Sequence, residues 1–193
     1  MSNISYLSVY AKSFSWAGYF LPKEKLKECS ALYDFCRVAD NIADDEGKIE
    51  NKLKKFTQFE NDFHKKNFKN SIIKNMWSLI EEFDISLKVV HDLLLGVKSD
   101  IKTEVKLDSK KDLLIYSYRV AGTVGLMMAK ILKVNKKNSL KSAIDLGIAM
   151  QLTNISRDVI EDAKNNRFYI NKDFGEISST INLAETFYEN SFY

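Results

Sequence analysis

Four aspartates in two equally spaced pairs are the residues of this sequence best suited to chemistry. Asp40 and Asp44 form the first pair, and Asp158 and Asp162 form the second, with most of the chain between them. On a helix, residues four apart lie about 40° apart around the axis and about 6 Å apart along it, so each pair presents two carboxylates on one face. Like charges at this spacing cost roughly 0.2–0.5 kcal/mol in an isolated helix and favour a compensating cation. Two such acidic stripes facing each other across a helical bundle would make a site for hard divalent cations.

Apolar residues interleave with both pairs and indicate that the carboxylates face inward. Val38 and Ile42 flank Asp40, and Ile155 and Val159 flank the aspartate that begins the second pair. A buried carboxylate is costly unless it is paired with a cation. The simplest such cation is Mg²⁺, which takes oxygen ligands and typically uses one or two carboxylates plus substrate phosphates. Taken alone, one pair at this spacing is more often a solvated helix face.

Arginines lie in the same elements as the aspartates. Arg37, Arg157 and Arg167 carry planar guanidinium groups, which suit bidentate contacts with phosphate. The simpler interpretation is an intrahelical ion pair, for instance between Arg37 and Asp40, worth about 0.3–0.5 kcal/mol. Both interpretations can hold at once. Metal and arginine together indicate a diphosphate ligand.

The composition favours a single helical domain. The chain has 193 residues, of which 45% are hydrophobic and 28% charged, and it contains only 7 Gly and 1 Pro, so helix breakers are rare. No linker, repeat or low-complexity tract divides it, and we expect one domain over residues 1–193. Apolar periodicity predicts helices at about 22–44, 48–65, 70–83, 86–101, 109–132 and 139–162, then a loop over 165–175 and an amphipathic segment from about 178.

Charge and hydropathy exclude several classes of function. The net charge of +3 is too small to predict nucleic-acid binding. Basic runs at 52–55 and 133–137 are expected to be solvated faces, with attraction to anionic lipid headgroups as the alternative. The longest apolar stretch, 120–132, is shorter than the roughly 20 residues that span a bilayer. Because the sequence also lacks a secretory signal pattern, we expect a cytoplasmic protein, with Cys29 and Cys36 reduced in the core.

Two features of the second half admit two interpretations each. Gly122 and Gly125 lie inside an apolar helix, which indicates either close helix packing or a helix broken or thinned to let a long apolar ligand lie against its backbone. The final amphipathic segment stops at Tyr193 with an aromatic face uncovered, which predicts either a truncated sequence or burial against another chain.

Taken together, these residues resemble the squalene/phytoene synthase family, whose members join two prenyl diphosphates head to head. The resemblance is collinear over nearly the whole chain. It rests on Ser13-Phe14, Phe20-Leu21-Pro22, the segment 31–40, the segment Gly96 to Asp100, the segment YSYRVAGTVG from Tyr116 to Gly125, and the spaced positions Gly147, Gln151, Asn154, Arg157, Asp158, Asp162, Arg167 and Tyr169.

The resemblance implies an all-α prenyl-synthase fold with a central cavity. It assigns metal binding to Asp40, Asp44, Asp158 and Asp162, with Asn154 and Gln151 supporting the second site. Contacts with diphosphate would come from Tyr33, Arg37, Arg157, Arg167 and Tyr169, while Ser13 and Phe14 would line the entrance and Tyr116 would contact substrate. Mg²⁺, or Mn²⁺ in its place, would be the cofactor.

The segment VAGTVGLMM is most similar to the phytoene synthase branch of the family. That branch joins two geranylgeranyl diphosphates through a cyclopropylcarbinyl diphosphate in carotenoid biosynthesis, and a peripheral membrane surface would receive the apolar product. Three alternatives remain. A presqualene or squalene synthase would use farnesyl diphosphate, and NADPH for squalene; a non-catalytic member would serve as an assembly or binding module; a terpene cyclase would act on one substrate.

The chain departs from the family pattern at two places. Asn171 stands where the family has a proline. Family members also continue for several more helices that help to enclose the cavity, so we expect this chain to lack its C-terminal helices.

Overall fold

Helices carry most of the chain in the computed structural model, which describes residue 18 and residues 20–192. In chain order the described elements are α3 (Lys23–Asp44), α4 (Ile49–His64), α5 (Ser71–Glu82), α6 (Leu87–Lys98), β1 (Val105–Lys106), α7 (Lys110–Ser117), η1 (Tyr118–Gly122), α8 (Thr123–Ile131), α9 (Lys137–Lys164), β2 (Arg167–Phe168) and α10 (Phe174–Ser191). The strands β1 and β2 pair in parallel over two residues each. The predicted all-α class is confirmed.

Local signals in the sequence set several helix boundaries. Helix α3 begins directly after Pro22, and it ends at Asp44, immediately before the acidic and glycine-containing turn. The Ser109 hydroxyl accepts a hydrogen bond from the backbone N–H of Asp112 at 3.1 Å, so the predicted N-cap of α7 is present.

The last loop is shorter than the sequence predicts. Helix α10 begins at Phe174, not near residue 178, because Asp173 caps it by accepting a hydrogen bond from the Glu176 backbone N–H at 2.9 Å. Asn171 stabilises the same turn, because its side-chain amide donates a hydrogen bond to the Glu176 carboxylate at 2.6 Å. Side-chain hydrogen bonds therefore hold this loop where the family pattern has a proline ring.

Helices α7 and α8 form one rod that widens in the middle. Residues Tyr118–Gly122 form a π-helix, a short widened turn that is frequently found at functional sites. Close packing explains Gly125, because a β-carbon there would collide with the Ala143 carbonyl of α9. Gly147 of α9 is confined in the same way by the Ala121 carbonyl. The rod is thus pressed against α9 along its length.

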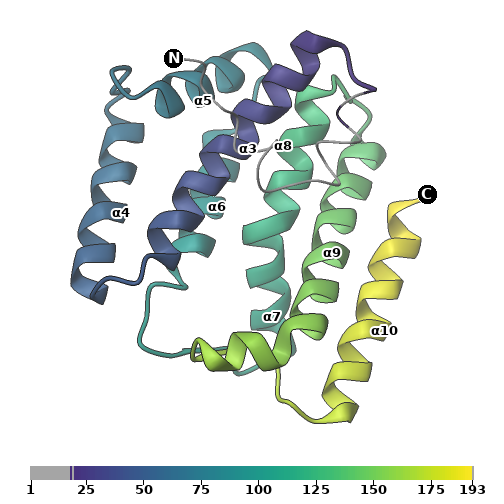
Figure 1. Ribbon diagram of the computed structural model, residues 1–193. Helices are drawn as coiled ribbons and strands as arrows, with labels where there is room; N and C mark the ends of the chain where they lie inside the picture. Colours follow the sequence, from purple (N-terminus) through teal and green to yellow (C-terminus); the bar gives the residue numbers. More distant parts are fainter. Residues whose placement is uncertain (1–17, 19, 193) are drawn as a thin grey trace.

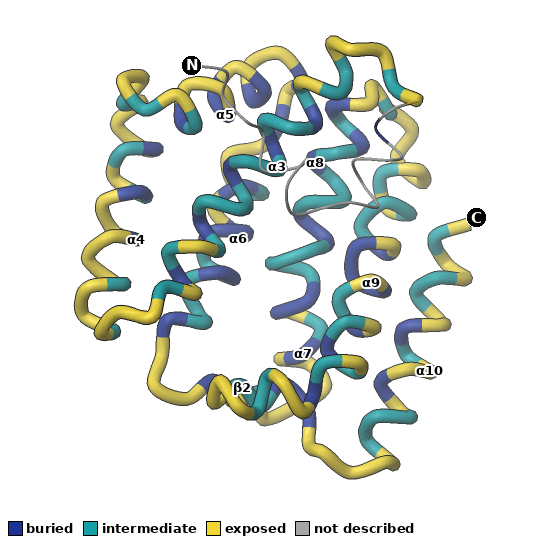
Figure 2. The backbone as a smooth tube through the Cα atoms, in the orientation of Figure 1, coloured by how far each residue is buried: buried dark blue, intermediate teal, exposed yellow. Residues whose placement is uncertain are grey.

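Figure 1 shows α3, the α7–α8 rod, α9 and α10 arranged across the molecule. Figure 2 marks β2 near the α7 end of the rod. Two hydrophobic clusters hold these elements together. The first unites α3 to α6 with α8 and includes Leu32, Phe35, Phe56, Phe63 and Met76. The second unites α7, α9, α10, β1 and the residues after β2, and it includes Leu113, Leu152, Ile155, Tyr169 and Ala184. In Figure 2, the buried residues lie mainly on the sides of these helices that face one another.

The sequence predicts that both cysteines are reduced and lie in the core. Both are free; Cys29 is buried, whereas Cys36 is partly exposed. Within the described residues, the structure contains no helix whose length and apolar content would carry it through a bilayer.

Candidate active site

Both aspartate pairs line one pocket of about 260 Å³. Asp40 and Asp44 reach it from the C-terminal end of α3, and Asp158 and Asp162 reach it from the last turns of α9. The pocket is also lined by the predicted substrate-binding residues Tyr116, Gln151, Asn154, Arg157, Arg167 and Tyr169. Residues more than a hundred positions apart thus converge as the acidic stripes predict.

Helix ends add negative potential to this pocket. Asp44 is the final residue of α3, and Asp162 lies in the last turn of α9. A helix C-terminus carries the negative end of the helix dipole, so both carboxylates lie where further negative charge is unfavourable. The pocket is therefore built to attract cations.

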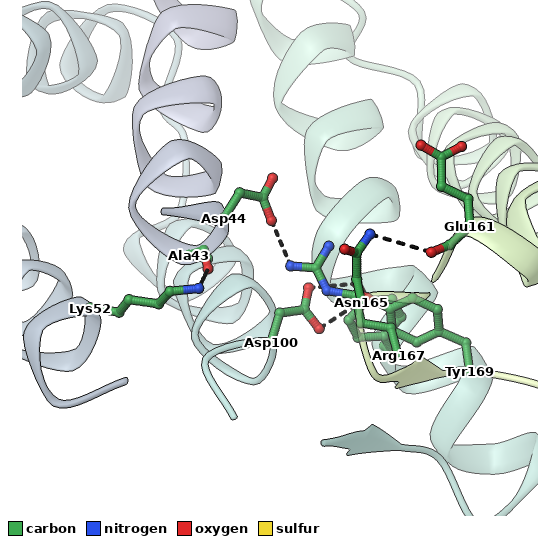
Figure 3. A network of polar contacts seen from close by, with 9 residues as sticks. Ala43, Asp44, Lys52, Asp100, Glu161, Asn165, Arg167 and Tyr169 are labelled. Carbon is green, nitrogen blue, oxygen red and sulfur yellow. Dashed lines mark hydrogen bonds and ion pairs between the residues drawn. The ribbon is translucent and has the colours of Figure 1, made fainter. Parts of the chain in front are cut away.

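Arg167 brings positive charge into this pocket. Its Nη2 donates to Oδ1 of Asp44 at 2.6 Å, joining β2 to the end of α3. In Figure 3 its guanidinium lies between Asp44 and Asp100. Burial disfavours the charged guanidinium, but the hydrogen bond that it donates to Asp44 and the nearby Tyr169 and Asp100 still hold the pKa of Arg167 above its ordinary value.

The first pair contains a carboxyl that is partly buried. Burial, followed by repulsion from Asp44, raises the pKa of Asp40 from 3.8 to about 6, although Arg37 and Arg167 partly offset this. Asp40 thus gains more from a positively charged ligand than an ordinary surface aspartate does.

In the second pair, Asp158 is neutralised within its own helix. Arg157 donates to both oxygens of Asp158, at 2.7 and 2.6 Å, and this hydrogen bonding lowers the pKa of that carboxyl. Asp162 differs, because burial raises its pKa while Arg167 lowers it. One aspartate of each pair is therefore bound to an arginine.

A third acidic residue, Asp100, enters the pocket from the loop after α6. It accepts hydrogen bonds from the hydroxyls of Tyr116, at 2.8 Å, and Tyr169, at 3.2 Å. Burial raises the pKa of the Asp100 carboxyl to about 6, although these hydrogen bonds and Arg167 pull it down. Sequence reasoning placed Asp100 in a family-like segment but gave it no role, because a single aspartate in a loop has no periodic signal.

The other predicted site residues fall elsewhere. Tyr33 and Arg37 both lie on α3, but neither is among the described residues that line this pocket. Each interacts electrostatically with Asp40, and the two also interact with each other. Ser13 and Phe14 lie outside the described residues. Apolar lining from Val97, Val120 and Ile155 completes the pocket.

The donor set fits Mg²⁺ shared with a ligand. Among the residues that the structure describes, no three His, Cys, Asp or Glu side chains are grouped so as to hold a metal by themselves. Mg²⁺ does not need such a group, since it typically takes one or two protein carboxylates and completes its shell with water and substrate phosphates. Aspartate and asparagine oxygens on two sides of one pocket meet that requirement.

Comparison with known proteins identifies the family of the chain. The sequence profile of the squalene/phytoene synthase family matches residues 7–175. The chain is 34% identical over 166 residues to phytoene synthase of Rhodobacter capsulatus, covering 84% of this chain and 49% of that protein. It is 32% identical over 175 residues to 4,4'-diapophytoene synthase of Staphylococcus haemolyticus, covering 84% of this chain and 59% of that protein. The chain thus spans about half the length of the curated relatives it matches.

Solved structures define the class of fold. A crystal structure of a dehydrosqualene synthase in complex with ligand superposes with a TM-score of 0.83 at 30% identity, covering 97% of this chain and 74% of that one. Squalene synthase HpnC from Alicyclobacillus acidocaldarius has the same fold, with a TM-score of 0.80 at 15% identity, covering 95% of this chain and 78% of that one. The molecule therefore has the all-helical terpenoid-synthase fold. With the profile match over most of its length, the chain belongs to the squalene/phytoene synthase family.

Proposed function

We propose that this chain carries the diphosphate-ionising site of a head-to-head prenyl synthase, which joins two geranylgeranyl diphosphates into phytoene. The observation that carries the proposal is the convergence of Asp40, Asp44, Asp158 and Asp162 on one pocket that also holds two arginines. The family membership and the phytoene synthases among the relatives support it.

The acidic residues would act on the leaving group. Asp40, Asp44, Asn154, Asp158 and Asp162 would hold Mg²⁺, which supplies charge stabilisation to the departing diphosphate. Arg157 and Arg167 already lie in the pocket, each bound to an aspartate. Guanidinium groups bind phosphate bidentately, so both arginines can move from carboxylate to substrate when the aspartates take a cation.

The apolar lining would protect the reaction. Loss of diphosphate leaves an allylic cation, and the double bond of a second substrate attacks it; loss of a proton then closes a cyclopropane ring. A second ionisation and rearrangement of that cyclopropylcarbinyl diphosphate would give a new cation, which loses a proton to become the hydrocarbon phytoene. Water would intercept either cation, and Val97, Val120 and Ile155 line the pocket without offering it a hydrogen bond.

Farnesyl diphosphate is the second candidate substrate. Proteins named 4,4'-diapophytoene synthase and dehydrosqualene synthase match this chain at identities close to those of proteins named phytoene synthase. The names among the relatives therefore do not single out one prenyl chain length. A squalene product would in addition require NADPH.

The test is product identification by mass. The 193-residue chain is incubated with geranylgeranyl diphosphate and Mg²⁺, and separately with farnesyl diphosphate with and without NADPH. We expect phytoene, lost when Mg²⁺ is chelated and in Asp40→Ala and Asp158→Ala. Glu161→Gln is the matched control, because Glu161 is an exposed carboxylate on α9 beside the second pair.

Two results would contradict the proposal. One is a hydrocarbon yield that is unchanged in the aspartate variants. The other is failure to form product together with failure to bind a non-hydrolysable prenyl thiodiphosphate in the presence of Mg²⁺, measured by calorimetry. Such a chain would instead fit the non-catalytic binding module.

A further inference from the structure

Asp100 joins two tyrosines that come from different parts of the chain. Tyr116 lies on α7 and Tyr169 follows β2, and their rings stack with centroids 4.7 Å apart and planes 24° apart. Their hydroxyls lie 3.0 Å from each other. The hydroxyl of Tyr116 donates to Oδ2 of Asp100, and that of Tyr169 donates to Oδ1. One carboxylate therefore fixes both rings.

The stacked rings lie between the candidate active site and two further grooves. Tyr169 lines the active-site pocket and also a groove of about 400 Å³ beside α10, which includes Lys106 and Thr180. Tyr116 lines the same active-site pocket and a groove of about 280 Å³ that includes Lys106 and Arg119. The ring pair is thus a wall between the candidate active-site pocket on one side and these two grooves on the other.

Asp100 is suited to keep this wall in place. Both tyrosines are only 7% exposed, and a buried phenol adopts the orientation in which its hydroxyl finds a hydrogen-bond partner. Hydrogen bonds to an ionised carboxylate are shorter and stronger than those between neutral groups. Losing Asp100 would release both rings together, whereas losing either hydroxyl would leave the other ring attached.

We propose that Asp100 is a positioning residue, which holds Tyr116 and Tyr169 as a closed wall and so keeps water away from the carbocation. This inference rests on the proposed function, because it concerns the cation formed when a prenyl diphosphate ionises. It assigns to Asp100 control over the fate of the cation, and only a small part in binding the substrate.

The test measures how the cation is partitioned. Capture by water adds the oxygen of water to carbon and releases a proton, giving a prenyl alcohol in place of the hydrocarbon. In H₂¹⁸O, alcohol from this capture carries ¹⁸O on carbon, whereas hydrolysis at phosphorus keeps the original oxygen on carbon. The ratio of ¹⁸O-alcohol to hydrocarbon is counted per turnover, so it does not depend on the fraction of chain that folds.

We expect Asp100→Ala to raise this ratio about tenfold or more, since small displacements of positioning groups have effects of this size, with little change in KM. Asp100→Asn keeps one acceptor oxygen and should give an intermediate ratio. In a Tyr116→Phe/Tyr169→Phe chain, adding Asp100→Ala should change the ratio no further, because Asp100 acts through the two hydroxyls. Glu104→Gln, an exposed carboxylate in the same loop, is the matched control and should leave the ratio unchanged.

The outcomes separate the two proposals. If the unaltered chain makes hydrocarbon and Asp100→Ala leaves the ratio unchanged, the positioning role is wrong while the proposed function stands. If Asp100→Ala still binds a prenyl thiodiphosphate but makes neither alcohol nor hydrocarbon, Asp100 is needed for ionisation and the positioning role is again wrong. If the unaltered chain ionises neither geranylgeranyl nor farnesyl diphosphate, the proposed function fails, and this inference fails with it.

Discussion

The two aspartate pairs share a spacing of four residues, but they differ in how their charge is balanced. In the first pair, Asp40 is partly buried, and this burial raises its pKa to about 6. In the second, Asp158 is also partly buried, but Arg157 beside it lowers its pKa. Identical spacing thus produces one carboxyl that is costly to ionise and one that ionises readily.

This difference separates stability from function. An aspartate that is paired by its own helix costs the folded state little, whereas a carboxyl that is buried beside another carboxyl stores unfavourable energy. In the proposed function a bound cation would release that energy. The first pair should therefore be the more demanding of the two for the folded protein, and both should be needed for turnover.

The largest expected effect comes from the arginine that acts on both pairs. Arg167 bonds Asp44 and also partly offsets the rise in the pKa of Asp40 and Asp162, whereas Arg157 bonds its neighbour Asp158. We expect Arg167→Ala to slow diphosphate release by about 10²–10³-fold, since one preorganised donor to developing charge is worth about that much. Release is measured with geranylgeranyl diphosphate and Mg²⁺.

Arg157→Ala is the matched variant and should slow release by about tenfold, because its exposed side chain is screened by water. Equal losses in the two variants would show that Arg167 is not the cation shared by the pairs.

The next effect is on stability. Replacing Asp40 by Asn removes a carboxyl whose pKa burial raises to about 6, so Asp40→Asn should increase the free energy of unfolding at pH 7 by about 1–2 kcal/mol. The measurement is urea unfolding followed by circular dichroism, without Mg²⁺. A loss of stability in this variant would mean that Asp40 is already compensated by Arg37 and Arg167.

A smaller effect is the pH dependence of that gain. A carboxyl whose pKa is raised in the folded state binds its proton more tightly there, so its contribution to stability is present below about pH 4 and is lost as the pH rises through about 6. The stability difference between Asp40→Asn and the unaltered chain should therefore be near zero at pH 4 and reach its full size by pH 7. Thermal unfolding at several pH values tests this, and a difference that does not vary with pH would contradict it.

The smallest effect is expected for the second pair. Asp158→Asn should leave stability at pH 7 almost unchanged, with at most a slight loss, because its ion pair with Arg157 is between neighbours and largely solvated. Its lowered pKa gives the opposite sign to Asp40, since that contribution is present at neutral pH and is lost as the pH falls. A stabilisation like that of Asp40→Asn would remove the contrast between the pairs.

Much of the fold and part of the site could be predicted from local signals. Periodicity and caps predicted the helices around both pairs, including the end of α3 at Asp44 and the Ser109 cap of α7. The convergence of the aspartates followed from their spacing and their apolar neighbours. The early start of α10 was missed, because Asp173 caps a turn that the apolar pattern does not mark.

Within the described residues, the sequence by itself determined the all-α class, the acidic faces and the arginines that accompany them, because helix periodicity and residue type are local properties. Only the tertiary structure decided which carboxyl is buried, which arginine serves both pairs, and that Asp100 joins Tyr116 to Tyr169. These outcomes depend on contacts between residues up to 123 positions apart, since burial and charge pairing arise only when separate elements pack against one another.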